Sequence, residues 1–244
     1  MPSSIPALWI SASPSLKYFD QPLMRYLAGQ THLAQWEYCQ TLDEGSSIET
    51  AIALLHQYLQ HQDDPVHLMG HGISGIVALL YSRYYPERVK SLTLLAVSAQ
   101  PAVTWHAHYY VQRQLLPCSQ TQVLGQLMVS LFGQKPPYSI KEIIHVLRLD
   151  LESSPGLHSL FKLNRLPQGG VPMPMLVCGS KTDPIVDPSA LADWAAWLKP
   201  EDRLWECLDG HHFFHYFHPQ LVGDQILDFW QSQSARQSLL QLNY

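Results

Sequence analysis

The sequence is poor in charged residues. Lys, Arg, Asp and Glu make up 14% of its 244 residues, and the formal net charge is −5, whereas charged residues make up about 25% of typical soluble domains. A nucleic-acid-binding protein needs a broad cationic surface for the phosphate backbone, so we expect no nucleic-acid partner. The weakly charged surface suits contact with another protein or a membrane face.

Long apolar runs and paired cysteines are also lacking. No run approaches the roughly 18 to 20 apolar residues that span a bilayer. No basic residue precedes the first apolar segment, as it would in a secretory signal. The four cysteines lie far apart without a CxxC pair, at Cys39, Cys118, Cys178 and Cys207. We therefore expect a cytoplasmic protein with free, buried thiols and no transmembrane segment.

The order of the apolar segments indicates a sheet flanked by helices. Hydrophobic residues make up 46% of the chain, which is enough for a large core. In the first hundred residues, predicted strands at 8–10, 33–39, 66–69 and 91–97 alternate with predicted helices at 21–28, 47–60 and 76–85. This alternation is typical of a mostly parallel α/β sheet.

After residue 100 the pattern becomes mainly helical. Helices are predicted at 105–116, 121–132, 139–149 and, more briefly, 157–163. Strand order resumes at 174–178 and 203–208, with helices at 188–198 and 219–231. We interpret residues 101–168 as a helical lid subdomain on a single domain that spans residues 1–244.

A strand, a glycine-rich turn and a helix follow one another between Val66 and Tyr85. The turn reads GHGISG at residues 70–75. It resembles the nucleophile elbow of the α/β-hydrolase fold, where the family typically has Gly-His-Ser-x-Gly-Gly. Matching both the end of the strand and the start of the helix puts Gly72 at the nucleophile position. The catalytic serine of the family is therefore absent.

Two further segments resemble the rest of the family's triad, in the family's order of nucleophile, acid and histidine. Residues 175–186, MLVCGSKTDPIV, resemble the strand and turn that present the acid, which makes Asp183 its equivalent. Residues 209–215, DGHHFFH, resemble the turn of the catalytic histidine, with His212 as the best match. The resemblance spans residues 8–231.

This resemblance implies an α/β-hydrolase fold of the lid-containing, esterase- and haloperoxidase-like branch. The lid would follow the sixth strand of the family, and the family's N-terminal hairpin is absent. The strand at 8–10 is then expected at or near a sheet edge, where a partner chain or the C-terminal tail would cover it.

The family also stabilises an oxyanion with two backbone N–H groups. By resemblance, the first belongs to Ile73 and the second to Ser13, in a loop where Ser11 and Ala12 replace the usual His-Gly pair. Ser74 would act as nucleophile only in a turn shifted toward the helix, so a packing or capping role is the favoured interpretation.

Glycine fits the nucleophile position physically. The elbow holds its central residue at a strained positive φ, which glycine reaches without a Cβ penalty. Loss of the serine should therefore leave the fold intact.

The segment 211–218, HHFFHYFH, contains histidine pairs at i, i+4 and i, i+3, which on a helix could share a metal ion. No carboxylate or cysteine stands beside them at ligand spacing, and the family requires no metal. We therefore predict no metal and no cofactor.

Three functions remain open. The first is a non-catalytic binding or scaffold protein, whose candidate partners are a small apolar ligand under the lid and another protein. The second is a serine-independent hydrolase or lyase that uses the His212–Asp183 pair as a general base. The third is an active, esterase-like hydrolase with a rearranged turn.

Overall fold

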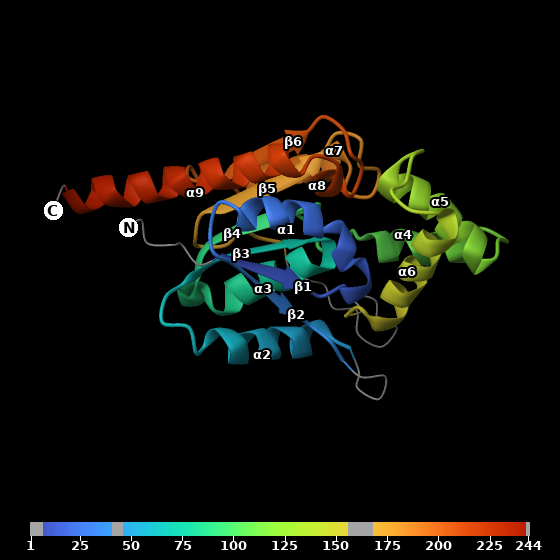
Figure 1. Ribbon diagram of the computed structural model, residues 1–244, viewed down its shortest axis with the longest axis horizontal. Coiled ribbons are helices and arrows are strands. Elements are labelled where there is room, and N and C mark those ends of the chain that lie inside the picture. Colours follow the sequence, from blue (N-terminus) through green and yellow to red (C-terminus); the bar gives the residue numbers. More distant parts are fainter. Residues whose placement is uncertain (1–6, 41–45, 156–167, 243–244) are drawn as a thin grey trace.

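The computed structural model describes residues 7–40, 46–155 and 168–242. Within these ranges, six strands form one parallel sheet in the order β2-β1-β3-β4-β5-β6. The strands are β1 (Ala7–Ser11), β2 (Leu33–Glu37), β3 (Val66–His71), β4 (Val89–Leu95), β5 (Met175–Ser180) and β6 (Arg203–Cys207). The predicted fold class is confirmed (Figure 1).

Helices connect these strands. They are α1 (Gln21–Ala28), α2 (Ile48–Leu59), α3 (Gly72–Tyr84), α4 (Trp105–Leu115), α5 (Gln120–Phe132), α6 (Ile140–Ser153), α7 (Pro188–Ala192), α8 (Phe214–Phe217) and α9 (Pro219–Leu242). Short 3-10 helices are η1 (Pro14–Phe19), η2 (Pro86–Arg88) and η3 (Asp193–Ala196). The predicted piece at 157–163 lies outside the described residues.

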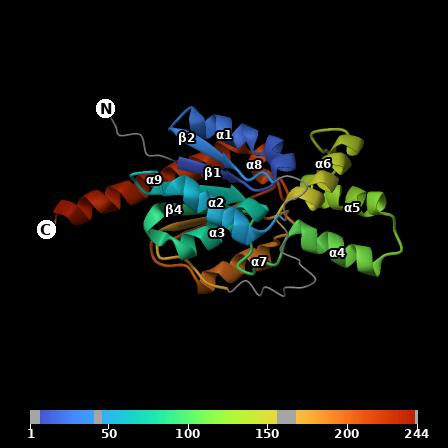
Figure 2. The ribbon, with the colours of Figure 1, turned by 90° about the horizontal axis from the view of Figure 1, so that it is seen from below.

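The two faces of the sheet bury different helices because successive side chains of a strand point to opposite faces. In β1, Leu8 and Ile10 join a core cluster with apolar residues of α2 and α3. Trp9 points the other way and packs with residues of α1 and α9. Figure 1 shows α1 and α9 on one side of the sheet, and Figure 2 shows α2 and α3 on the other.

The first strand lies next to the sheet edge, as expected, but neither side of β1 is open to a partner chain. β1 pairs with β2 on one side and with β3 on the other, and Trp9 and Ile10 are fully buried. The chain places β2 outside β1 and then crosses back to add β3 on the inner side, so β2 is the edge strand. The backbone hydrogen-bonding groups of β1 are therefore not open to a partner chain.

Three helices between β4 and β5, α4 to α6, form the helical insertion, which projects beyond one end of the sheet (Figure 1). α5 packs against both α4 and α6, and α6 packs against η1. Ser119 and Ser139 each close a capping box, with Gln122 and Glu142 respectively. These boxes satisfy the first backbone N–H groups of α5 and α6 and fix where the two helices begin.

Some details differ from the sequence-based expectations. α3 begins at Gly72 rather than at residue 76, because the turn leads directly into the helix, and α9 continues to Leu242. All four cysteines are free, but Cys39 is exposed and Cys118 half-buried, because both lie outside the strands. Among the helices of the described ranges, none combines the length and apolar character that crossing a bilayer requires.

Candidate active site

The turn between β3 and α3 has the geometry of an elbow. His71 ends β3 in an extended conformation, and Gly72 begins α3 with a φ of +53°, in the left-handed region that favours glycine. The turn is also tightly packed: a Cβ atom on Gly70 would lie 2.7 Å from the backbone carbon of Ser74. The sequence thus folds locally as its glycine spacing predicted.

Asp183 and His212 form a buried hydrogen-bonded pair. Their side chains come from the segments after β5 and β6, and His212 Nδ1 lies 2.8 Å from Asp183 Oδ2. Each residue is only 2% exposed. The other carboxylate oxygen accepts the backbone N–H of Ile185 over 2.8 Å. With Nδ1–H donated to the ionised carboxylate, His212 Nε2 is left as a proton acceptor.

The structure brings the three predicted triad positions together. A Cβ atom on Gly72 would lie 3.8 Å from His212 Nε2, with open space otherwise. A serine hydroxyl at position 72 would therefore come within hydrogen-bonding reach of the imidazole. The geometry of a histidine-activated nucleophile is present although the side chain that would supply the nucleophile is not.

The predicted oxyanion residues lie at the same place. Ser13 and Ile73 line a small cavity together with Gly72 and His212. The neighbouring backbone N–H of Ala12 is donated to Ser74 Oγ over 2.8 Å, so this group is already occupied. The roles of Ser13 and Ile73 as oxyanion donors remain predictions.

The cavity at Gly72 is small. Its volume is about 20 Å³, room for about one water molecule. Leu16 of η1, Trp105 of α4 and Phe213 also line it. The helical insertion therefore contributes directly to the enclosure of the elbow.

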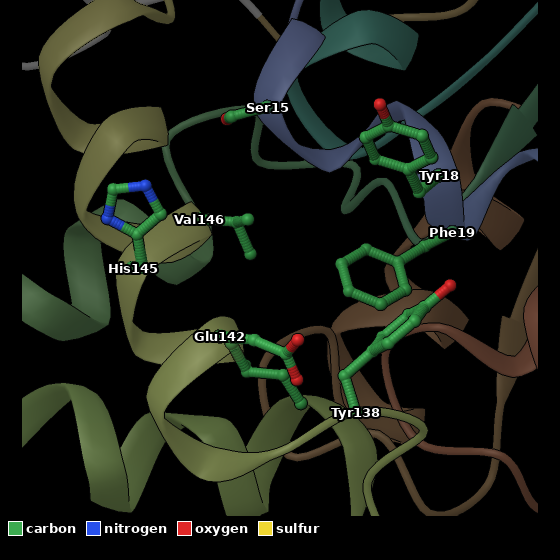
Figure 3. A pocket seen from close by; sticks show the side chains of 8 residues that line it. Ser15, Tyr18, Phe19, Tyr138, Glu142, His145 and Val146 are labelled. Atoms are coloured by element: carbon green, nitrogen blue, oxygen red, sulfur yellow. The ribbon is translucent and has the colours of Figure 1, made fainter.

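A larger groove lies between η1 and α6, with a volume of about 340 Å³. We call it the η1–α6 groove. It is lined by Ser15, Tyr18, Phe19, Tyr138, Glu142, Ile143, His145 and Val146. Figure 3 shows Phe19 and Val146 facing each other across it. The ring centroids of Phe19 and Phe213 are 5.0 Å apart, so Phe19 links the groove wall to the wall of the small cavity.

A buried polar network joins the insertion to η1. Asp150, which is 0% exposed, accepts hydrogen bonds from His106 Nε2 at 2.8 Å, Ser154 Oγ at 2.6 Å and Ser15 Oγ at 3.0 Å. This network was not predicted from the sequence. No local motif could reveal the pairing, because the partners lie on separate helices.

A second buried His–Asp pair adjoins the elbow. His215 Nε2 lies 2.9 Å from Asp20 Oδ1, and Trp9 Nε1–H donates to Asp20 Oδ2 over 3.1 Å. His71 Nε2–H donates to the carbonyl oxygen of His212 over 3.0 Å. Burial, with the nearby His215 and His212 as smaller contributions, lowers the pKa of His71 well below its usual value. His71 is therefore neutral at physiological pH.

The histidine-rich segment 211–218 is divided between different partners. His215 turns inward to Asp20, whereas His218 pairs with Asp209 near the surface. The structure therefore does not use the helical pairs suggested by the sequence spacing. It combines His215 with residues that are distant in the sequence.

The parallel sheet, the elbow and the buried His212–Asp183 pair define a hydrolase-like protein of the α/β-hydrolase fold. The chain is 54% identical over 231 residues to the uncharacterized protein alr2406 of Nostoc sp.. The matched region covers 95% of this chain and 92% of the relative. It is 39% identical over 238 residues to the uncharacterized protein sll0249 of Synechocystis sp., at coverages of 98% and 95%. The chain belongs to the family of these two proteins.

One further sequence shows a weaker similarity, and two solved structures have a similar fold. RutD of Azorhizobium caulinodans, named for a proposed carbamate hydrolase activity, is 27% identical over 180 residues, 68% of this chain and 66% of RutD. A thermophilic esterase from Thermogutta terrifontis superposes with a TM-score of 0.69 at 15% identity, covering 94% of this chain and 90% of the esterase. A membrane phospholipase A gives a TM-score of 0.70 at 17% identity, with coverages of 96% and 81%. No protein-family model matches the chain.

Proposed function

We propose that this hydrolase-like protein is a binding protein that performs no serine-based hydrolysis. The observation that carries the proposal is Gly72, which stands at the nucleophile position opposite His212 Nε2. Serine hydrolases that lose a member of the triad typically lose several orders of magnitude in kcat. In this proposal the fold is retained for its binding surfaces.

Ser74 is a poor replacement for the missing nucleophile. It is 4% exposed, and its Oγ accepts the hydrogen bond from Ala12 N–H. It belongs to the first turn of α3, two residues beyond the elbow position. These contacts support a structural role, which joins α3 to the loop after β1.

The η1–α6 groove is the proposed ligand site. Its volume of about 340 Å³ falls in the range of small-molecule pockets, about 300 to 1,000 Å³, whereas the cavity at Gly72 does not. Aromatic and aliphatic side chains dominate its walls. We infer a small, apolar or aromatic ligand, and we assign residues 101–168 the role of a lid because α6 forms one wall.

Ester hydrolysis tests the loss of the nucleophile. The wild type, Gly72→Ser and Gly72→Ala would be compared on p-nitrophenyl acetate and butyrate. Alanine is the matched control, because it adds the same Cβ at the same positive φ without a hydroxyl. We expect turnover above buffer only for Gly72→Ser, with loss of that gain when His212→Ala is added. Wild-type turnover that His212→Ala abolishes would contradict the proposal.

Ligand binding at the groove can be tested with the fluorophore 1-anilinonaphthalene-8-sulfonate. Val146→Glu places a negative charge in the groove, where it repels the anionic probe, and Leu149→Glu places the same charge on an exposed position of α6 outside it. We expect saturable binding to the wild type, weakened at least about tenfold by the first variant and unchanged by the second. Equal affinities for both variants would remove the groove from the proposal.

One observation favours a second candidate, a serine-independent hydrolase or lyase. The His212–Asp183 pair is intact, and His212 lines a cavity with room for a water molecule. In this candidate, His212 Nε2 acts as general base on that water or on a substrate proton. Turnover of activated esters by the wild type that is lost in His212→Gln would favour it over the binding protein.

A further inference from the structure

Asp20, His71 and His215 gather beside the elbow from three separate segments. One donor atom of each residue lies within 4.8 Å of the other two. The ring centroids of His71 and His215 are 4.5 Å apart, and His215 Nε2 is 2.9 Å from Asp20 Oδ1. We propose that these three side chains bind one divalent transition-metal ion of the zinc type.

The donor set suits such an ion. Two imidazoles and one carboxylate are a common ligand set for zinc in sites that keep a fourth position open. At bond lengths of about 2.0 to 2.2 Å, tetrahedral ligand atoms stand about 3.3 Å apart. The Asp20–His215 separation is already close to this value, so modest side-chain rotation would complete the site.

The outer contacts orient the ligands. Trp9 Nε1–H donates to Asp20 Oδ2, and His71 Nε2–H donates to the carbonyl oxygen of His212. Metal-bound histidines almost always donate their second ring N–H to a carbonyl, a carboxylate or water. These hydrogen bonds leave His71 Nδ1 as a donor to the metal, and Asp20 Oδ1 becomes one when the metal replaces its hydrogen bond with His215 Nε2.

One ring nitrogen of His215 lacks a hydrogen-bond partner in the part of the chain that the structure describes. His215 is fully buried, and its Nδ1 has no hydrogen-bond partner among the described residues. Buried polar atoms are nearly always satisfied, and an exception suggests an ion or water. The 2.9 Å contact with Asp20 Oδ1 favours Nε2 of His215 as the metal ligand. Nδ1 would then keep the ring proton and take a water as its partner.

The small cavity beside the elbow would leave one coordination position of the metal open. Asp20 and His71 line the same cavity of about 20 Å³ as Gly72 and His212. A water molecule fits this space, whereas a serine at position 72 would extend its side chain toward His212 and occupy part of it. None of the three ligands lines the η1–α6 groove. The metal proposal therefore does not depend on the proposed ligand site.

A cobalt titration tests the site. The purified full-length protein would be dialysed against a chelator and then titrated with Co²⁺, whose visible absorption reports low-symmetry coordination, with Zn²⁺ as competitor. We expect one equivalent bound with a Kd of about 1 µM or lower. Asp20→Asn and His215→Gln should each weaken binding by at least about tenfold.

Two control variants separate this site from other donors. His106→Gln removes an equally buried imidazole from the Asp150 network, and His218→Ala disrupts a second group of donors formed with Cys207 and Asp209. Both should bind Co²⁺ as the wild type does. Absence of stoichiometric uptake by the wild type, or uptake lost in His218→Ala but retained in Asp20→Asn, would overturn the proposal.

NMR of the wild type tests the site even if the ligand variants do not fold. The ring nitrogens of the 13 histidines can be followed by NMR in ¹⁵N-histidine-labelled protein with and without Zn²⁺. We expect metal-dependent shifts at His71 and His215. Shifts confined to other histidines would contradict the site.

Discussion

Ser74 Oγ accepts a hydrogen bond from the backbone N–H of Ala12 over 2.8 Å and so joins the first turn of α3 to the loop after β1. Both residues are buried, and water cannot easily replace the lost acceptor. The same loop carries Ser13, whose backbone would complete an oxyanion hole. The contact therefore holds this loop against the elbow.

Ser74→Ala should destabilise the protein by about 1 to 3 kcal/mol, because the amide of Ala12 stays buried without an acceptor. The free energy of unfolding in urea measures this effect. Ser153→Ala is the control, since the Ser153 hydroxyl is exposed and donates to a carbonyl of its own helix, and it should change stability by less than about 0.5 kcal/mol. Equal losses in the two variants would argue against the role of the Ser74 contact.

Alanine should destabilise the protein to different extents at two glycines of the elbow. On Gly70, a Cβ would lie 2.7 Å from the backbone carbon of Ser74 and 2.8 Å from the backbone nitrogen of Gly75, and no flexible side chain can move away. We expect Gly70→Ala to cost at least about 3 kcal/mol or to prevent folding. Gly72→Ala meets no close atom and should cost only about 1 to 2 kcal/mol for its positive φ.

Thermal unfolding of the two variants in parallel measures the difference. A Gly72→Ala protein that is less stable than Gly70→Ala would mean that backbone strain, not close packing, limits the residues that the elbow accepts.

The elbow could be predicted from the sequence because it is local. Its strand, turn and helix lie within twenty residues, and the spacing of its glycines resembles that of a known family motif. The turns that present Asp183 and His212 were recognisable for the same reason. The structure brings these positions together, whereas their chemical roles remain predictions.

Contacts between distant segments could not be predicted. Asp20 and His215 are 195 residues apart in the chain, and neither segment carries a signal for the other. The position of β2 outside β1 was missed because strand order depends on the direction in which each crossover returns, which hydrophobic patterns do not encode.

The buried Asp150 network should contribute strongly to the attachment of the helical insertion. Asp150→Ala would leave His106, Ser15 and Ser154 without their shared acceptor, and we expect a loss of about 3 kcal/mol. Glu37→Gln is the control, because it removes a solvent-exposed ion pair between Lys17 of η1 and Glu37, and it should cost less than about 1 kcal/mol. Urea unfolding measures both, and limited proteolysis should cut the insertion faster only in Asp150→Ala.

The stability of the protein should fall in mild acid because of His67. Its ring is buried in β3, lies 2.6 Å from Ser91 Oγ through Nδ1 and stacks on Trp230. Burial, and to a smaller extent the positive charge of Lys90, lowers the pKa of His67 to about 3. In the unfolded chain the same group has its ordinary pKa of about 6.5.

Between these two pKa values, the unfolded state binds a proton that the folded state does not. The contribution of a neutral His67 to stability is therefore fully present above about pH 6.5 and decreases as the pH falls toward 3, by up to about 1.4 kcal/mol per pH unit. His67→Gln keeps a polar side chain near Ser91 but cannot titrate, so its free energy of unfolding should depend less steeply on pH between about pH 6 and pH 5. His61→Gln, the control, removes an exposed histidine and should leave the pH dependence of the wild type unchanged. A His67→Gln curve parallel to that of the wild type would mean that His67 does not titrate on unfolding.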